Sequence, residues 1–312
     1  MIFELLILGS TSAVPTFERY LSCQILNVHD KLYMIDCGEG TQFRLQHFRI
    51  SHHKIENIFI SHLHGDHILG LPGLINSMNI NARKKKLRLF CPVGLDKMLE
   101  TIFEISGSKI GFEIEYCFID FSAKKKIYED SEVEIFSFPL DHRIGTAGFR
   151  FNEKGRLRNI DPSTIARYGL SYNQIRAAKY GNDIEFADGN VIRNKDITLP
   201  PKKLRSFAYC SDTKYNPGII SSIKNVDLLY HESTYLEHLS DKANERFHST
   251  AMDAAKIAKK AGAGKLLLGH FSSRYSDLSQ FVTEAKEYFD DVELGIEGKR
   301  FTVDLKNIDD EF

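Results

Sequence analysis

The chain has 312 residues, of which 42% are hydrophobic and 27% are charged, a composition typical of a folded globular protein. Its formal net charge is −1, which excludes a uniformly cationic nucleic-acid binder, so any affinity for a polyanion must come from local clusters. Five scattered cysteines without a CxxC pair argue against a disulfide framework and favour a reducing compartment. The first residues read as a strand, not a signal peptide, and no apolar run could cross a bilayer. We therefore expect a cytoplasmic protein without a membrane anchor.

The first half of the chain alternates strands and helices. Apolar segments at residues 4–8, 21–28 and 31–35 predict strands, and Gly38 and Gly40 lead into a helix that continues to Arg49. A short buried strand at 57–60, a helix at about 66–79, a strand at 87–91 and a helix at 94–105 follow. Between residues 112 and 151, apolar and polar residues alternate with few helix signals, which predicts a run of antiparallel strands.

The second half contains a segment of different character. Residues 153–199 are polar, contain four glycines and end before two prolines, with short helical patterns at 163–168 and 172–179. Strands at 206–210, 228–231 and 265–269 then alternate with helices at 249–260 and 278–289. This order predicts an α/β protein with layers of helix, sheet, sheet and helix. We expect one domain over residues 1–312, with an inserted arm at about 155–196.

The most informative motif is Ser-His-Leu-His-Gly-Asp-His at residues 61–67. It places His62, His64, Asp66 and His67 directly after a predicted strand, and imidazole nitrogen and carboxylate oxygen are both good zinc ligands. Side chains on a tight loop point in different directions, so one such peptide can supply two metals. A surface loop that is rich in histidine by chance is the alternative, but the chain has only 12 histidines.

Further candidate ligands follow three other predicted strands. His142, Asp212 and His270 each stand just after a strand. Taken singly, each could be an ordinary hydrogen-bonding residue. Their shared position favours a common site, because α/β folds collect ligands at the carboxyl ends of strands.

Eight motifs in a fixed order resemble a known family. Their residues are 9–15 (Gly-Ser-Thr-Ser-Ala-Val-Pro), 36–42 (Asp-Cys-Gly-Glu-Gly-Thr-Gln), 61–67, 139–142 (Pro-Leu-Asp-His), 211–213 (Ser-Asp-Thr), 231–234 (His-Glu-Ser-Thr), 248–250 (His-Ser-Thr) and 270–275 (His-Phe-Ser-Ser-Arg-Tyr). The histidine loop with its downstream His, Asp and His resembles the metallo-β-lactamase superfamily. The whole ordered set is similar to ribonuclease Z of the short form.

The resemblance implies a fold, a reaction and a cofactor. The fold would be the metallo-β-lactamase αββα sandwich, with two mixed sheets packed face to face and helices outside. The reaction would be zinc-dependent endonucleolytic removal of 3′ trailers from tRNA precursors, leaving a 3′-hydroxyl on the tRNA and a 5′-phosphate on the trailer. Two Zn²⁺ per subunit are implied, with Mn²⁺ as a possible substitute. The alternative within this fold is a phosphodiesterase that acts on small phosphodiesters.

The resemblance also assigns residues. It implies that His62, His64 and His142 hold one zinc, that Asp66, His67 and His270 hold the second, and that Asp212 bridges both. Asp36 would support the histidine loop, although a turn aspartate after a strand is an equal alternative on sequence alone. For catalysis, it implies Asp66 as proton acceptor and His248, oriented by Glu232, as proton donor to the leaving oxygen. The alternative for His248 is a residue that merely precedes a helix, beside a capping Ser249 or Thr250.

Precursor tRNA is the expected partner, and two basic clusters could contact it. One is the run from Arg83 to Lys86 with Arg88, which closely follows the helix after the histidine loop and is therefore expected near that loop, where it could contact phosphate. A solvated loop is the alternative. The other lies in the arm and comprises Lys154, Arg156, Arg158, Arg167, Arg176 and Lys179, interleaved with Tyr168, Tyr172 and Tyr180. Acids concentrate at Asp290, Asp291, Glu293, Asp304, Asp309, Asp310 and Glu311.

The resemblance also implies an arm that grips the tRNA body and a homodimer in which each arm serves the other subunit. The chain departs from the family at residues 170–174 (Leu-Ser-Tyr-Asn-Gln), where a Gly-Pro-rich tip is usual. A zinc-stabilised RNA-binding protein without catalysis is a competing interpretation from a different class, and the complete ligand set disfavours it.

Overall fold

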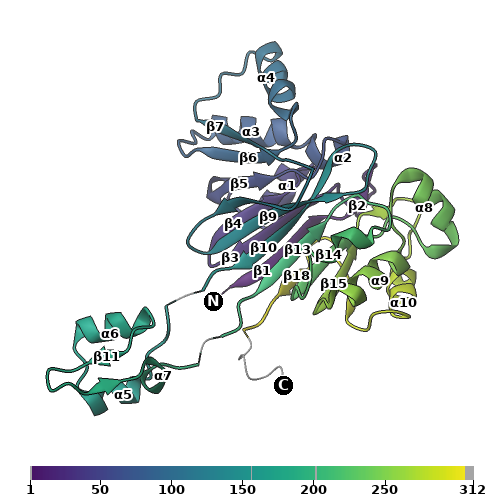
Figure 1. Cartoon of the computed structure of the whole chain (residues 1–312). Helices are drawn as coiled ribbons and strands as arrows, with labels where there is room; N and C mark the ends of the chain where they lie inside the picture. Colours follow the sequence, from purple (N-terminus) through teal and green to yellow (C-terminus); the bar gives the residue numbers. More distant parts are fainter. Residues whose placement is uncertain (1, 156, 201, 306–312) are drawn as a thin grey trace. The chain divides into compact units, whose positions relative to one another are not determined.

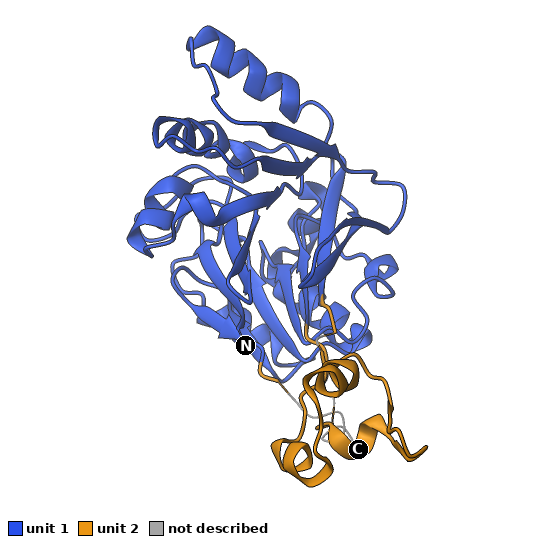
Figure 2. Cartoon of the chain, turned by 90° about the vertical axis from the view of Figure 1, so that its left-hand side faces the viewer, with its two compact units in different colours: residues 1–152, 206–303 blue, residues 153–205, 304–312 orange. Residues whose placement is uncertain are grey.

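The computed structural model describes residues 2–155, 157–200 and 202–305. These residues fall into two compact units, shown in two colours in Figure 2: residues 1–152 with 206–303, and residues 153–205 with 304–312. The proposed contributions of Arg156, Asp309, Asp310 and Glu311 to the charge pattern lie outside the described residues.

The first unit contains two seven-stranded mixed sheets among its described residues (Figure 1). The strand order of the first sheet is β18 (Arg300–Thr302), β1 (Phe3–Gly9), β3 (Cys23–Val28), β4 (Lys31–Ile35), β5 (Ile55–Phe59), β6 (Leu87–Cys91) and β7 (Ile114–Phe118). The second has the order β17 (Val292–Leu294), β15 (Lys265–Gly269), β14 (Leu228–Glu232), β13 (Ser206–Cys210), β10 (Thr146–Glu153), β9 (Val133–Leu140) and β8 (Lys125–Glu129).

Parallel pairing dominates the part of each sheet that carries the candidate site. Strands β4, β5, β6 and β7 pair in parallel with one another, and so do β13, β14, β15 and β17. The next strand in each sheet, β3 beside β4 and β10 beside β13, is antiparallel. The expectation of one antiparallel run from residue 112 to 151 is therefore wrong for β7, which pairs in parallel with β6 in the first sheet. Alternation along a strand shows that one face is buried, but it does not show which neighbour the strand pairs with.

Three layers of apolar side chains hold the unit together. In β1, Leu5 and Ile7 point between the sheets and pack with Phe149 of β10, whereas Leu6 and Leu8 point toward the helices. This alternation follows from the two-residue period of a strand whose two faces are both buried. The helices α1 (Thr41–His47), α3 (Leu71–Ile80) and α4 (Leu95–Ile105) cover the first sheet, and α9 (Ala251–Ala261) and α10 (Ser279–Ala285) cover the second. The predicted αββα order is confirmed.

The helix predicted at 66–79 is divided in two. It forms α2 (Gly65–Ile68) and α3, and Gly70 lies at the break. A Cβ atom on Gly70 would lie 2.0 Å from the carbonyl oxygen of Gly38, so the two backbones touch there. Pro72 stands in the first turn of α3, where its missing N–H has no partner to lose.

The second unit is a small folded body with its own apolar core. It contains α5 (Pro162–Tyr168), α6 (Tyr172–Lys179), β11 (Ile184–Glu185), β12 (Val191–Ile192) and α7 (Asn194–Ile197). Its core residues are Ile160, Leu170, Ala178, Ile184 and Ile197. The segment that departs from the family pattern forms a capping box, in which Ser171 and Gln174 start α6.

The remaining elements are short. They are β2 (Thr11–Ser12), β16 (Phe271–Ser272), α8 (Ser240–Arg246) and the 3₁₀ turns η1 (His52–Lys54), η2 (Pro217–Ile219) and η3 (Glu237–Leu239). Of the helices in the described ranges, none combines the length and apolar character that a bilayer span requires.

Candidate active site

The structure brings the predicted ligands together at the carboxyl ends of strands from both sheets. The loop after β5 supplies His62, His64, Asp66 and His67, and the segments after β9, β13 and β15 supply His142, Asp212 and His270. Among the described residues, these side chains form two groups, His62, His64, His142 with Asp212, and Asp66, His67 with His270. Asp212 and His270 also form a third, overlapping group with His248. Within each group, one ligand atom per residue lies within 4.8 Å of every other.

In the first group, three imidazole nitrogens converge. His64 Nδ1 lies 3.0 Å from His62 Nε2 and 3.2 Å from His142 Nε2. The Oδ2 atom of Asp212 lies 3.6 Å from His62 Nε2 and 3.7 Å from His142 Nε2. Burial lowers the pKa of His62, His64 and His142, which favours the neutral imidazole that binds metals.

In the second group, the other oxygen of Asp212 takes part. Its Oδ1 atom lies 3.2 Å from His270 Nε2 and 3.4 Å from His67 Nε2. The Nε2 atoms of His67 and His270 are 3.2 Å apart, and Asp66 Oδ2 lies 3.4 Å from His270 Nε2. The carboxylate of Asp212 therefore presents one oxygen to each group.

The donor set fits divalent metal ions. In a tetrahedral zinc site with bonds of about 2.0–2.1 Å, neighbouring ligand atoms are about 3.3 Å apart, close to the separations observed here. Asp212 Oδ1 is buried and has no hydrogen-bond partner of good geometry among the described residues, although two imidazole nitrogens face it. Burial alone would raise the pKa of Asp212, but the surrounding imidazoles lower it well below its usual value, which favours the ionised carboxylate that metal ions bind.

Contacts behind the imidazoles orient them toward the cluster. His142 Nδ1 lies 2.9 Å from the carbonyl oxygen of Phe247, and His62 Nδ1 lies 3.0 Å from Ser61 Oγ. His270 Nδ1 lies 3.0 Å from Thr234 Oγ1. Such partners on the far nitrogen fix the ring and leave the near nitrogen for a metal.

Asp36 is the most heavily hydrogen-bonded of these supporting groups. It follows β4, is fully buried, and accepts hydrogen bonds from Ser61 N (2.7 Å), Ser61 Oγ (2.9 Å), His67 Nδ1 (2.8 Å) and Tyr209 Oη (2.7 Å). Because Tyr209 lies on β13, this carboxylate joins the histidine loop of the first sheet to the second sheet. The interpretation of Asp36 as an ordinary turn residue is not compatible with these contacts.

Glu232 and His248 form a buried pair beside the second group. His248 Nδ1 lies 2.9 Å from Glu232 Oε1, which also accepts from the backbone N–H groups of Thr213 and Ser249. Burial opposes protonation of His248, but the charge of Glu232 prevails and raises the pKa of the imidazole to about 9. Thr250, not Ser249, caps α9, so the His248 side chain is free of any capping role.

A pocket of about 390 Å³ opens onto the cluster. Its lining includes Asp66, Asp212 and His248 together with the loop at residues 12–15. The backbone N–H of Ala13 donates to Asp66 Oδ2 over 2.8 Å. Ala13, Asp36 and His270 all have left-handed backbone conformations, with φ of 59°, 55° and 59°, which cost roughly 1–2 kcal/mol each. Strain of this kind gathers at functional sites.

Comparison with known proteins places this geometry in a family. Ribonuclease Z of Cytophaga hutchinsonii is 44% identical over 304 residues, which cover 97% of this chain and 97% of the relative. Ribonuclease Z of Porphyromonas gingivalis strain W83 is 41% identical over 287 residues, covering 92% and 94%. A family model described as Anti-Pycsar protein Apyc1 matches residues 3–153.

The chain belongs to the ribonuclease Z family. The resemblance drawn from the ordered motifs is thereby confirmed.

Solved structures agree on the fold. The human tRNase Z short form superposes with a TM-score of 0.70 at 24% identity, covering 96% of this chain and 99% of that one. The metallo-β-lactamase fold protein YhfI from Bacillus subtilis gives 0.69 at 17% identity, with the same coverage. The predicted metallo-β-lactamase fold is confirmed for this ribonuclease Z family member.

One of the two basic clusters lies in a different place from the one expected. Residues 83–86 precede β6, which runs parallel to β5, whereas the histidine loop follows the carboxyl end of β5. The run therefore lies at the opposite edge of the sheet, and its expected proximity to the metal loop is wrong. Arg83 is buried against the carbonyl oxygens of Lys85 and Lys86, whose ammonium groups pair with Glu56 and with Glu113 and Glu115, respectively. Closeness in sequence misled because α3 carries the chain back to the amino ends of the strands before β6 begins.

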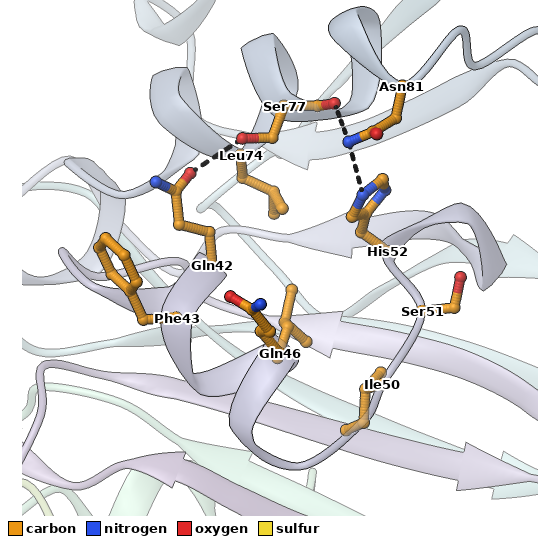
Figure 3. A pocket seen from close by; sticks show the side chains of 10 residues that line it. Gln42, Phe43, Gln46, Ile50, Ser51, His52, Leu74, Ser77 and Asn81 are labelled. Carbon is orange, nitrogen blue, oxygen red and sulfur yellow. Dashed lines mark hydrogen bonds between the residues drawn. The ribbon is translucent and has the colours of Figure 1, made fainter.

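A second pocket of about 420 Å³ lies between α1, η1 and α3 (Figure 3). Its lining combines the polar residues Gln42, His52, Ser77 and Asn81 with apolar ones such as Leu74. Its lining contains one histidine and no carboxylate, so it offers no metal site comparable to the cluster.

Sequence reasoning did not assign several groups that touch the site. Thr234 lay inside a recognised motif, and Ala13 lay in the loop at residues 9–15, so both had a sequence signal. Tyr209 reads only as an aromatic residue of a strand, and Phe247 contributes a backbone carbonyl. Neither of these two has a side-chain pattern that a single sequence reveals.

Proposed function

We propose that the chain is a zinc-dependent endoribonuclease that removes 3′ trailers from tRNA precursors, leaving a 3′-hydroxyl on the tRNA and a 5′-phosphate on the trailer. Membership of the ribonuclease Z family supports this reaction. The observation that carries the proposal is the placement of Asp212, whose two oxygens face two separate groups of histidine ligands.

Two zinc ions per subunit would fit this arrangement, with Mn²⁺ as a possible substitute. His62, His64 and His142 would hold one ion, Asp66, His67 and His270 the other, and Asp212 both. Three carboxylates, Asp36, Asp66 and Asp212, lie among the imidazoles of the cluster, and divalent cations would offset their charge. When bound, such a pair supplies Lewis acidity toward a phosphodiester and makes a water nucleophile available near neutral pH.

Two side chains of the site would carry out the two proton transfers of the reaction, Asp66 as acceptor and His248 as donor. Asp66 Oδ2 accepts the Ala13 N–H, which orients this carboxylate at the edge of the pocket to take a proton from the attacking water. The Nδ1 atom of His248 is engaged by Glu232, so its other ring nitrogen can donate a proton to the ribose 3′-oxygen as that oxygen leaves. General acid catalysis of this kind contributes roughly 100-fold to 10,000-fold.

The second unit is the proposed tRNA-binding arm. Residues 153–205 contain eleven Lys and Arg against six Asp and Glu, a net charge of +5, so the rest of the chain carries −6. Arg167, Arg176 and Lys179 have exposed side chains that can neutralise phosphates and release counterions. Reversing these three charges should raise KM for precursor tRNA steeply at physiological salt and leave hydrolysis of bis-p-nitrophenyl phosphate unchanged.

We further propose a homodimer, as the family resemblance implies, located in the cytoplasm. All five cysteines are free thiols, consistent with a reducing compartment. Sedimentation at micromolar concentration would test the dimer, and a purely monomeric enzyme with full activity would refute it.

The decisive experiment maps the cut on a precursor tRNA that carries a 3′ trailer, with bis-p-nitrophenyl phosphate as a second substrate. The His248→Ala variant should lose roughly 100-fold or more in kcat on precursor tRNA. It should keep most activity on the small ester, because p-nitrophenolate leaves without a proton. Activity on small diesters with none on precursor tRNA would favour the phosphodiesterase alternative. Metal binding without either activity would favour the RNA-binding alternative.

A further inference from the structure

Thr234 lies between a proposed metal ligand and the proposed proton donor. It follows β14, is 2% exposed, and its backbone N–H donates to Glu232 Oε2 over 2.9 Å. Its hydroxyl oxygen lies 2.8 Å from the same carboxylate oxygen and 3.0 Å from His270 Nδ1. One hydroxyl therefore lies within hydrogen-bond distance of both His270 and Glu232.

The direction of each hydrogen bond follows from the number of protons available. A carboxylate can only accept, so the single hydroxyl proton of Thr234 goes to Glu232. The hydroxyl oxygen is then an acceptor toward His270, whose ring proton must be on Nδ1. His270 Nε2 is left with its lone pair, and this is the atom that lies 3.2 Å from Asp212 Oδ1.

The same carboxylate extends the connection to His248. Glu232 Oε2 receives both Thr234 donors, and Oε1 receives His248 Nδ1 over 2.9 Å. The order of contacts is therefore His270, Thr234, Glu232, His248. Thr234 Oγ1 is also 3.3 Å from His248 Nδ1, so the two imidazoles share one hydroxyl as a neighbour.

We propose that Thr234 is a positioning residue that couples the second group of metal ligands to the Glu232–His248 pair. It sets the tautomer of His270 and fixes the carboxylate that orients His248. This inference rests on the proposed function, because it assigns Thr234 a part in the same reaction.

Two substitutions of Thr234, by valine and by serine, separate the effect of losing the hydroxyl from the effect of changing the shape of the side chain. Thr234→Val keeps the volume but removes the acceptor of His270 Nδ1–H and one donor to Glu232. Contacts behind a metal-binding histidine are typically worth roughly 10-fold to 100-fold in metal affinity or activity. We expect a loss in this range for zinc affinity and for kcat on precursor tRNA, and Thr234→Ser should restore both to within about 3-fold of the wild type.

Thr250→Val is the matched control for damage to the fold. Thr250 is also fully buried, and its hydroxyl donates to Glu237 over 2.7 Å and caps α9. This variant should lower the melting temperature of the metal-free protein yet leave zinc affinity within about 3-fold of the wild type, since capping residues act on stability.

The test measures zinc affinity by competition with a chromophoric chelator, and cleavage of precursor tRNA and bis-p-nitrophenyl phosphate at saturating zinc. With zinc saturating, Thr234→Val should lose more on precursor tRNA than on the small ester. In a His248→Ala background, it should cost less on precursor tRNA than it does alone, since residues that act through one another are not additive.

Wild-type zinc affinity in Thr234→Val would overturn the coupling, as would equal losses in the Val and Ser variants or full additivity with His248→Ala. Failure of the proposed function would look different. The wild type would then not cut precursor tRNA, while the zinc measurements on Thr234→Val and Thr234→Ser would still decide the link to His270.

Discussion

Asp36→Asn tests how the histidine loop is held. The carboxylate accepts four hydrogen bonds, one at Oδ1 from Ser61 N and three at Oδ2 from Ser61 Oγ, His67 Nδ1 and Tyr209 Oη. An amide has one acceptor oxygen, so one position must become an NH₂ group. If the oxygen takes the Oδ2 position, the NH₂ faces the N–H of Ser61. If the oxygen takes the Oδ1 position, the NH₂ group faces His67 Nδ1. The ring proton of His67 must then move from Nδ1 to Nε2, the nitrogen that faces the other ligands.

Either arrangement has a cost that follows from these contacts. A buried N–H without an acceptor costs roughly 1–3 kcal/mol, and we expect the free energy of unfolding of the metal-free protein to fall by about this amount. Loss of the partner behind His67 should also weaken zinc binding roughly 10-fold to 100-fold. Urea unfolding of the metal-free protein and zinc competition with a chelator measure the two effects separately.

Asp130→Asn is the matched control. Asp130 lies before β9, at the end of that strand opposite His142. It also accepts from a tyrosine, Tyr33 Oη, over 2.8 Å, and from the backbone N–H groups of Glu132 and Val133. This variant should lose stability without losing zinc affinity. If Asp36→Asn bound zinc as tightly as the wild type, the proposed role of Asp36 in orienting His67 would be refuted.

Three further outcomes are expected. Burial would raise the pKa of Asp130, but hydrogen bonds from Glu132 and Lys31 lower it below its usual value. The metal-free protein should therefore lose stability as the pH falls below about 4, where this carboxylate becomes protonated. In urea unfolding at low pH, the Asp130→Asn variant should show less of this loss. Gly269→Ala would place a Cβ atom 2.1 Å from Tyr230 Oη and should cost about 3 kcal/mol in urea unfolding, whereas Gly155→Ala, where nothing lies within 4 Å, should cost little. Removal of metal with EDTA should abolish cleavage and lower the melting temperature, and adding zinc should restore both. Zinc at 100 times its Kd would contribute about 2.7 kcal/mol to the free energy of unfolding. A chelated protein that still cuts at the original rate would contradict the metal requirement.

Local features of the sequence determined most elements and the chemistry of the site. The strands at 31–35, 87–91, 206–210 and 265–269 have the predicted bounds, because short apolar runs between turn residues leave little freedom in where a buried strand begins and ends. The histidine loop stands out for a similar reason, since its residue types and spacing are rare outside metal sites. The order of the motifs along the chain indicated the family.

Only the tertiary structure decided which neighbours these residues meet. The pairing of β6 with β5 moved the basic run at 83–86 away from the site, and the pairing of β7 with β6 separated that strand from the antiparallel part. The contacts of Tyr209 with Asp36 and of Thr234 with His270 join segments 173 and 36 residues apart. Such contacts arise from the packing of two sheets and the loops at their edge, and strand pairing depends on the whole set of neighbours more than on any one segment.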